Sequence, residues 1–407
     1  MVGSSRDRRL LLYSLGDRRV LALGANGSVP AESADTANLF TGSYPRYVPG
    51  GHLVYLVGNT LMAVPFDPKR LRVLGPPAPV LQDVRREGWE GPGQYGFAED
   101  GTLVFAPGTD AAKSVLVWAD RMGRVTDTLP VPPGDYFNIY ASGDGLRVAL
   151  ATNQPTGQQT VSILDVQRGL LRELRSDVAT RFTAWWPDGE RAVVHLGPLF
   201  LAAPNQAGLT GRGGGAWRVS TDGAGSRDSL LEPGWMIMDV SRDLKYFAVR
   251  RLGDSTGAWL VAADGKQRQF LQPDAGWPIF SPDGRWLAFI SPEGLQITTV
   301  PADGRLQTVG PGTADEPEWS PRGDELYYRD GKRWMVMTVS TRDGLTVGKP
   351  RLLFEGRYLN VADKSYDVGP DGRFLLLLGP PEETVDHLDV VTGFLAEIQR
   401  LAPPGRK

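Results

Sequence analysis

One segment of the sequence matches the nucleophile-elbow pattern of serine hydrolases, G-x-S-x-G, and runs from Gly253 to Gly257 with Ser255 at its centre. In that chemistry the serine stands on a sharp turn between a strand and a helix, and an acid and a histidine follow later in the chain. Here the pattern falls in a loop between two short apolar runs, and His387 is the one histidine after it. We therefore interpret Ser255 as a loop residue and expect no catalytic residue.

Metal-ligand patterns are equally sparse. The three histidines, His52, His195 and His387, lie in different parts of the chain without ligand spacing. The absence of cysteine excludes disulfides, thiolate metal sites and a cysteine nucleophile. Aspartates recur at intervals, but a role in turns accounts for them (Asp100, Asp144, Asp188, Asp283 and Asp371). We expect neither a metal nor a cofactor.

The turns that contain these aspartates follow one pattern, clearest in Ser281-Pro282-Asp283-Gly284. Proline presets the backbone angle of the second position, serine and aspartate bind nearby amides, and glycine suits the last position. This pattern is typical of a turn between two antiparallel strands. Each copy precedes a short apolar run, and the fourth residues of the eight copies are at positions 51, 101, 145, 189, 244, 284, 323 and 372.

The copies are spaced 39 to 55 residues apart. A period near this length, built from short strands, indicates a β-propeller with one four-stranded blade per repeat. We therefore predict an all-β fold, a single β-propeller of eight blades. The alternative is a seven-bladed ring, if the repeat near Gly51 lies outside it.

A single domain is predicted over residues 1–407, with closing strands in 1–24, blades in 25–391 and a helix in 392–402. The runs Arg9–Leu15 and Arg19–Leu23 match the third and fourth strands of a repeat whose first two strands are missing. The last repeat, Tyr366–Val391, supplies the first strands but not the fourth. We expect the former to pair with the latter and close the ring, because closure removes free sheet edges. Thr392 is expected to cap the C-terminal helix.

A binding site is predicted at the propeller axis, from the residues just before the first strand of each repeat: Arg46, Tyr95, Asn138, Arg181, Trp235, Trp277, Glu316 and Tyr366. Aromatic and charged groups there suit a peptide, a protein or a small polar ligand. Replacing Trp235 and Trp277 with alanine is expected to abolish binding without loss of folding. The alternatives are that these residues only solvate the channel mouth, or that the axis holds an enzyme site, a hydrolase or lyase.

Composition limits the partners. The formal net charge of −3 disfavours a nucleic-acid-binding surface. The longest apolar runs, such as Phe374–Leu378, are too short to cross a membrane, and the start of the chain is not a convincing signal peptide. We expect no nucleic-acid partner and no membrane insertion by this chain itself.

Four segments resemble a known family: Tyr44–Tyr55, Gly58–Asp67, Leu116–Arg124 and Val390–Leu401. They are similar to the TolB-like, WD-repeat-like propellers that follow the kinase domain and membrane helix of many bacterial Ser/Thr protein kinases. The resemblance implies a kinase-associated binding or sensor domain outside the cytoplasm, in the periplasm or at the cell surface. The sequence has neither a kinase domain nor a membrane helix, and Thr392-Gly393 replaces the Asn-Trp pair common at the family's ending. A fragment, a free-standing relative and the non-catalytic propeller of a peptidase all remain open.

Overall fold

A computed structural model describes residues 2–4, 10–14, 19–24, 40–68, 70, 72–86, 93–108, 113–153, 159–174, 180–196, 215–222, 227–251, 256–341, 344–361, 363–380 and 386–403. The chain divides into two compact units. Unit 1 comprises residues 1–113, 154–158 and 380–407, and unit 2 comprises residues 114–153 and 159–379. Ser255 lies outside the described residues.

Six antiparallel sheets make up the described part of unit 2. In spatial order their strands are β14 (Tyr136–Ala141), β15 (Arg147–Asn153), β16 (Gln159–Asp165) and β17 (Leu170–Glu173); β18 (Thr180–Trp185), β19 (Arg191–Leu196), β20 (Ala216–Ser220) and β21 (Arg227–Leu231); β22 (Trp235–Val240), β23 (Tyr246–Arg251), β24 (Gly257–Ala262) and β25 (Arg268–Pro273); β26 (Gly276–Phe280), β27 (Trp286–Ser291), β28 (Gly294–Thr299) and β29 (Gln307–Thr308); β30 (Asp315–Trp319), β31 (Glu325–Asp330), β32 (Arg333–Ser340) and β33 (Thr346–Val347), with β34 (Arg351–Glu355) also on β32; and β35 (Tyr366–Val368), β36 (Phe374–Leu378), β12 (Val115–Ala119) and β13 (Val125–Thr128).

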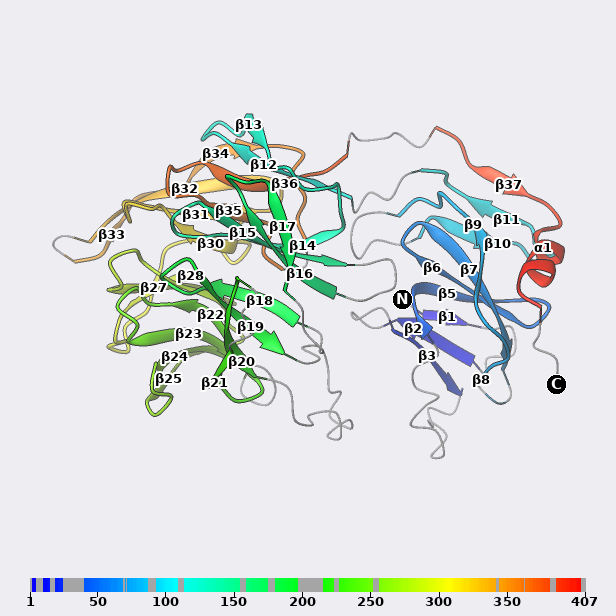
Figure 1. Cartoon of the computed structure of the whole chain (residues 1–407), viewed down its shortest axis with the longest axis horizontal. Helices are drawn as coiled ribbons and strands as arrows, with labels where there is room; N and C mark the ends of the chain where they lie inside the picture. Colours follow the sequence, from blue (N-terminus) through cyan, green and yellow to red (C-terminus); the bar gives the residue numbers. More distant parts are fainter. Residues whose placement is uncertain are drawn as a thin grey trace. The chain divides into compact units, whose positions relative to one another are not determined.

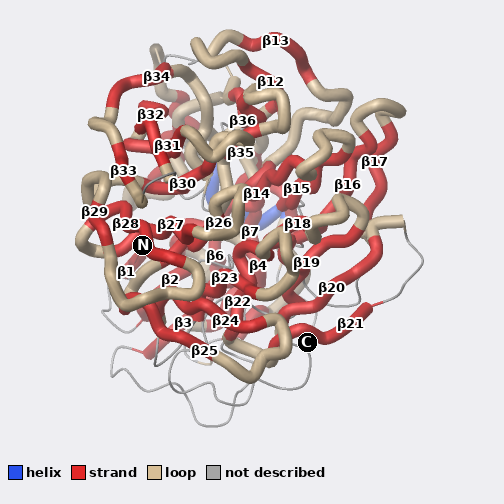
Figure 2. The backbone as a smooth tube through the Cα atoms, turned by 90° about the vertical axis from the view of Figure 1, so that its left-hand side faces the viewer, coloured by secondary structure: helices blue, strands red, loops and turns tan. Residues whose placement is uncertain are grey.

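The six sheets of unit 2 form a closed ring. The first strand of each sheet contacts the first strand of the next, in the order β14, β18, β22, β26, β30, β35 and back to β14. Figure 2 shows these strands around the centre of unit 2, with outer strands such as β17 and β21 at its edge. Unit 2 is therefore a β-propeller. The predicted counts of eight and seven blades are not confirmed. Each turn pattern marks a hairpin between two strands, but it does not show which ring that hairpin belongs to. The turns at Gly51 and Gly101 belong to unit 1.

The ring is closed by a segment other than the predicted one. β36 pairs with β12, so that Leu376 lies opposite Val117 (Figure 1). The strands predicted to close the ring, here β2 (Leu10–Ser14) and β3 (Arg19–Gly24), pair instead with each other, with β1 (Val2–Ser4) and with β4 (Phe40–Thr41). The prediction that the N-terminal strands close the ring was therefore wrong, because β12 occupies that position. β12 suits an inner position because Leu116, Val117 and Trp118 are all buried, which requires apolar contacts on both faces of the sheet.

The turn pattern is confirmed in all six sheets of unit 2. The amide of the fourth residue donates to the carbonyl of the first over 2.8–2.9 Å, for example from Gly284 to Ser281. In three copies the first-position serine hydroxyl bonds the third-position aspartate, as in Ser281 Oγ to Asp283 Oδ1 at 2.6 Å. The fourth residue has positive φ throughout, 59° at Leu244 and 69–79° at the five glycines of the other copies.

Leu244 is the one residue with a side chain in this left-handed slot of unit 2, and we predict that Leu244→Gly raises the free energy of unfolding by about 1 kcal/mol. Its side chain is 43% exposed, so little burial is lost. Leu146→Gly is the matched control: Leu146 is 42% exposed but has ordinary φ, so the change should destabilise. Urea melts of both variants test this, and a less stable Leu244→Gly would contradict it.

Unit 1 contains three sheets among its described residues: β1 to β4; β5 (Ser43–Val48), β6 (His52–Val57), β7 (Thr60–Asp67) and β8 (Arg72–Val73), with β9 (Ala78–Leu81) also on β7; and β10 (Tyr95–Phe97), β11 (Leu103–Phe105) and β37 (Asp389–Val391). The predicted C-terminal helix is confirmed as α1 (Phe394–Leu401). Its Phe394 and Ile398 pack into a cluster with residues such as Val54. The predicted cap was wrong, because Gly393, with φ of 69°, occupies the N-cap and no side chain caps the helix.

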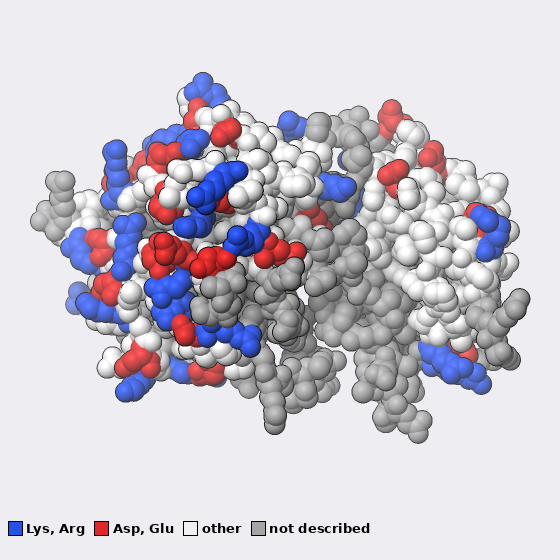
Figure 3. Space-filling view, in the orientation of Figure 1, with Lys and Arg blue, Asp and Glu red and all other residues white. Residues whose placement is uncertain are grey.

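No helix in the described part of the chain is long and apolar enough to cross a membrane. On the face of unit 2 seen in Figure 3, basic and acidic residues are interspersed and do not gather by sign. Many are neighbours in ion pairs, such as Arg285 with Asp283 at 2.8 Å. The single domain predicted over residues 1–407 stays a prediction.

Candidate functional site

A cavity of about 780 Å³ lies at the axis of unit 2, at the end where the six innermost strands finish. Two repeated positions enclose it. The wall is formed by the residue two places before each turn: Tyr140, Ala184, Asp239, Ile279, Glu318 and Asp367. The rim is formed by the second residue of each turn: Gly143, Pro187, Arg242, Pro282, Pro321 and Pro370. The ring thus converts one sequence position per repeat into one layer of the site.

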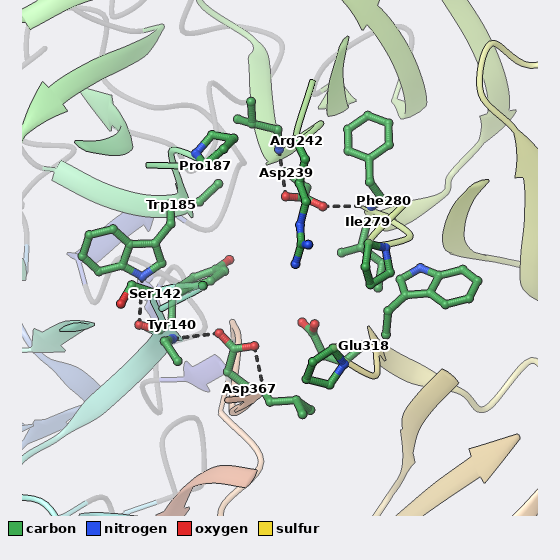
Figure 4. Close-up of a pocket in the computed structure, with 18 of the residues that line it drawn as sticks. Tyr140, Ser142, Trp185, Pro187, Asp239, Arg242, Ile279, Phe280, Glu318 and Asp367 are labelled. Carbon is green, nitrogen blue, oxygen red and sulfur yellow. Dashed lines mark hydrogen bonds between the residues drawn. The ribbon is translucent and has the colours of Figure 1, made fainter. Parts of the chain in front are cut away.

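Two wall aspartates connect neighbouring blades. Asp239 Oδ2 accepts a hydrogen bond from the Phe280 amide of the next blade at 2.8 Å, and Oδ1 accepts one from Val240 at 2.8 Å. Asp367 Oδ2, on β35, accepts a hydrogen bond from the Ala141 amide of the neighbouring blade, on β14, at 2.8 Å (Figure 4). Burial raises the pKa of Asp239 to about 6, although both amide bonds oppose the shift. These carboxylates stabilise the ring.

Lys364 is the cation that pairs with two of the wall acids. Its ammonium group pairs with Glu318 and, at 3.2 Å, with Asp367 Oδ1. It also lies 4.4 Å from the centre of the Tyr140 ring. The side chains of Lys364, Glu318 and Asp367 are 8%, 15% and 10% exposed. The two acids raise the pKa of Lys364 despite its burial, so it stays charged. Burial raises the pKa of Glu318, and Lys364 opposes this.

Arg242 differs from the other rim residues, which are prolines or glycine. Its side chain is exposed and extends into the cavity in Figure 4. No described residue forms a hydrogen bond or ion pair with its guanidinium. Aromatic residues line the cavity, and among them Trp185 donates its indole N–H to Tyr140 O at 3.1 Å. The cavity therefore combines aromatic and aliphatic side chains, three wall acids, and the Arg242 guanidinium, which has no partner among the described residues.

Of the eight predicted site residues, only Trp277 lines this cavity. Asn138 and Arg181 meet at Asp363, with Arg181 Nε 2.6 Å from Asp363 Oδ2. Tyr366 donates to Glu316 O at 2.7 Å. These four lie before the wall position on the innermost strands and form buried networks. Their role in binding stays a prediction.

The other three predicted site residues lie elsewhere. Trp235 is 6% exposed and packs against Trp259 in the core between blades, with ring centroids 5.2 Å apart. The predicted position of Trp235 at the channel mouth is therefore wrong. Because it lies in the core, we expect the replacement of Trp235 and Trp277 with alanine to destabilise unit 2. Arg46 on β5 and Tyr95 on β10 belong to unit 1.

A sequence signal for the wall existed. The prediction counted positions before each innermost strand, whereas the cavity lies beside the turns that follow. Counting back two residues from each turn finds Asp239, Glu318 and Asp367 in one slot. Arg242 was recognisable as the break in a row of prolines.

The histidines do not assemble a metal site, and the described residues contain no group of three or more potential ligands. His52 Nε2 donates to Ala402 O at 2.8 Å, holding the end of α1. His195 is 4% exposed, and burial, together with Arg181, lowers its pKa to about 3. His387 is exposed beside Asp386.

Glu316 carries a testable pH effect. It accepts hydrogen bonds from Ser365, and burial raises its pKa to about 7 from 4.5. The folded state thus holds its proton more tightly, so the protein loses stability as pH rises from about 4.5 through 7. We predict that Glu316→Gln removes up to about 3 kcal/mol of this loss.

Denaturant melts of wild type and Glu316→Gln between pH 5 and 8 measure it. The variant's curve should be flatter, whereas Glu355→Gln, at an exposed site on β34, should follow wild type. Parallel curves for Glu316→Gln and wild type would contradict the prediction.

No protein-family model and no curated protein matches the sequence. Among solved structures, a protein provisionally named TolB from Agrobacterium tumefaciens is similar at 18% identity and a TM-score of 0.48, over 66% of this chain and 99% of that one. TolB from Acinetobacter baumannii is similar at 13% identity and 0.41, over 76% and 82%. The Cps50 (Swd1) β-propeller domain of Myceliophteria thermophila is similar at 14% and 0.39, over 54% and 72%. The propeller fold stands on the strand pairings of unit 2, and no function follows from these similarities.

Proposed function

We propose that unit 2 is a non-catalytic binding module that takes a peptide, a segment of a protein or a small polar ligand into its axial cavity. The observation that carries this proposal is the cavity of about 780 Å³, open between the six turns and lined by aromatic and charged groups. Concave sites with an apolar wall and a few placed polar groups are typical of ligand binding. A sensory role in a receptor kinase and a location outside the cytoplasm rest on the family resemblance alone.

Two of the three wall acids support binding over catalysis. Asp239 and Asp367 use both carboxylate oxygens in bonds to backbone amides, and Asp367 also pairs with Lys364. A general base needs a free oxygen within reach of the substrate proton. Because both oxygens of these two carboxylates accept hydrogen bonds from backbone amides, neither carboxylate has a free oxygen for a substrate proton.

A second candidate, a hydrolase or lyase, has one observation in its favour. Asp239 and Glu318 both face the cavity, and burial raises the pKa of each. Paired acids with raised pKa values are a feature of acid–base catalysis. Mass spectrometry of ligands incubated with the protein separates the two, because only an enzyme changes the covalent structure of what it binds.

Gly143→Trp provides the test of the binding site. Gly143 is exposed on the rim, has no positive φ, and a Cβ there meets nothing within 4 Å, so tryptophan fills the mouth without strain. Gly312→Trp is the matched control, on an exposed loop away from the cavity.

Peptides selected from a displayed random library on the wild-type protein should lose at least tenfold in affinity for Gly143→Trp. They should bind Gly312→Trp as they bind wild type. Undiminished binding to Gly143→Trp would remove the axial cavity as the site.

A further inference from the structure

Two charged groups in the axial cavity have unused hydrogen-bonding capacity. Asp239 and Asp367 are bound by backbone amides, and Lys364 by two acids. Glu318 engages Lys364 through Oε1, and no described residue bonds its Oε2. The Arg242 guanidinium has no partner among the described residues either.

These two groups are opposite in sign and approach the cavity from different blades. Figure 4 shows Arg242 extending inward from the rim and the Glu318 carboxylate pointing toward the middle from the wall. They form no ion pair with each other in the described structure. Space for a ligand therefore lies between an available cation and an available carboxylate oxygen.

We propose that the cavity binds a dipolar ligand, which places an ammonium group at Glu318 and a carboxylate at Arg242. Free amino acids and short peptides carry both groups. This inference rests on the proposed binding function and names the ligand class for the same site. A ligand of one sign alone would cover the cavity and leave either the Arg242 guanidinium or Glu318 Oε2 without a hydrogen-bond partner, and that cost discriminates against it. Arginine also matches a carboxylate with two parallel hydrogen bonds.

The rest of the cavity lining suits an apolar body between the two charges. Trp185, Ile279 and Phe280 line the cavity. Trp319 lines it as well and is 6% exposed. An aromatic side chain on the ligand would bury its surface against these apolar side chains.

Four related probes test the proposal by isothermal titration calorimetry. L-phenylalanine carries both charges on one carbon, and the dipeptide Ala-Phe separates them by a peptide unit. 2-Phenylethylamine lacks the carboxylate, and 3-phenylpropanoate lacks the ammonium group. We expect one of the two dipolar probes to bind at least tenfold more tightly than either singly charged probe. The tighter of the two separates a free amino acid from a peptide as the ligand type.

Two variants assign the charges. Arg242→Met, at an exposed turn position, should abolish the preference for the dipolar probe over 2-phenylethylamine. Glu318→Gln should abolish its preference over 3-phenylpropanoate. Thermal melts check that both variants fold, and Arg242→Met alone suffices if Glu318→Gln is unstable. Equal affinities of all four probes, or a preference unchanged in Arg242→Met, would overturn the proposal.

Gly143→Trp distinguishes this failure from that of the proposed function. If library peptides depend on Gly143 while the dipolar probes show no preference, the cavity binds ligands but the ligand class is wrong. If no binding depends on Gly143, the site itself is wrong.

Discussion

Lys364→Met is expected to lower the free energy of unfolding by about 3–5 kcal/mol, because it leaves buried carboxylates without their counter-charge. The lysine is 8% exposed and is the cation that pairs with both Glu318 and Asp367. In the folded variant these acids must either stay charged in a poorly solvated site or take up protons. The loss should therefore be smaller at pH 5 than at pH 8, which denaturant melts at both values measure.

Lys245→Met is the matched control for this change. Lys245 pairs with Asp243 at 3.1 Å but is 72% exposed, and exposed pairs contribute less than about 1 kcal/mol. Adding Glu318→Gln to Lys364→Met should restore part of the lost stability, since it removes one of the unpaired charges. Similar losses in Lys364→Met and Lys245→Met would show that the ion pairs at the axis do not hold the ring together.

Val117→Asp is expected to unfold unit 2 or to destabilise it by more than about 4 kcal/mol. Val117 is fully buried on β12, opposite Leu376 of β36, in a cluster that includes Phe374. A carboxylate there has no partner, and it breaks the strand pairing that closes the ring. All tryptophans except Trp89 lie in the residue ranges of unit 2, so tryptophan fluorescence follows its unfolding.

Two comparisons make the closure test specific. Val125→Asp makes the same change on the neighbouring strand β13, where the side chain is 45% exposed, and should cost little. Deleting residues 1–24 should leave the fluorescence melt of unit 2 unchanged, because β2 and β3 pair with each other and with β1 and β4. A deletion that lowers the melting temperature of unit 2 as much as Val117→Asp would restore closure by the N-terminal strands.

The sequence by itself determined the local units of this fold. Ser-Pro-Asp-Gly and its variants specify a turn through contacts within four or five residues, and so the turns at Gly145, Gly189, Gly284, Gly323 and Gly372 were all recognised. The variant at Leu244 followed because its serine and aspartate keep the same hydrogen bond. The amphipathic spacing of Phe394 and Ile398 likewise predicted α1. Together these features predicted a propeller.

Only the tertiary structure decided which repeats share a ring and which strand closes it. Segments 10–14 and 115–119 are both short apolar runs, and a β-strand's affinity for an edge depends on backbone amides that every residue carries. The choice of β12 over β2 as the partner of β36 depends on packing against residues distant in sequence. The candidate site has the same origin. Asp239, Glu318 and Arg242 line one cavity because the six innermost strands surround one axis, an arrangement that no single repeat contains.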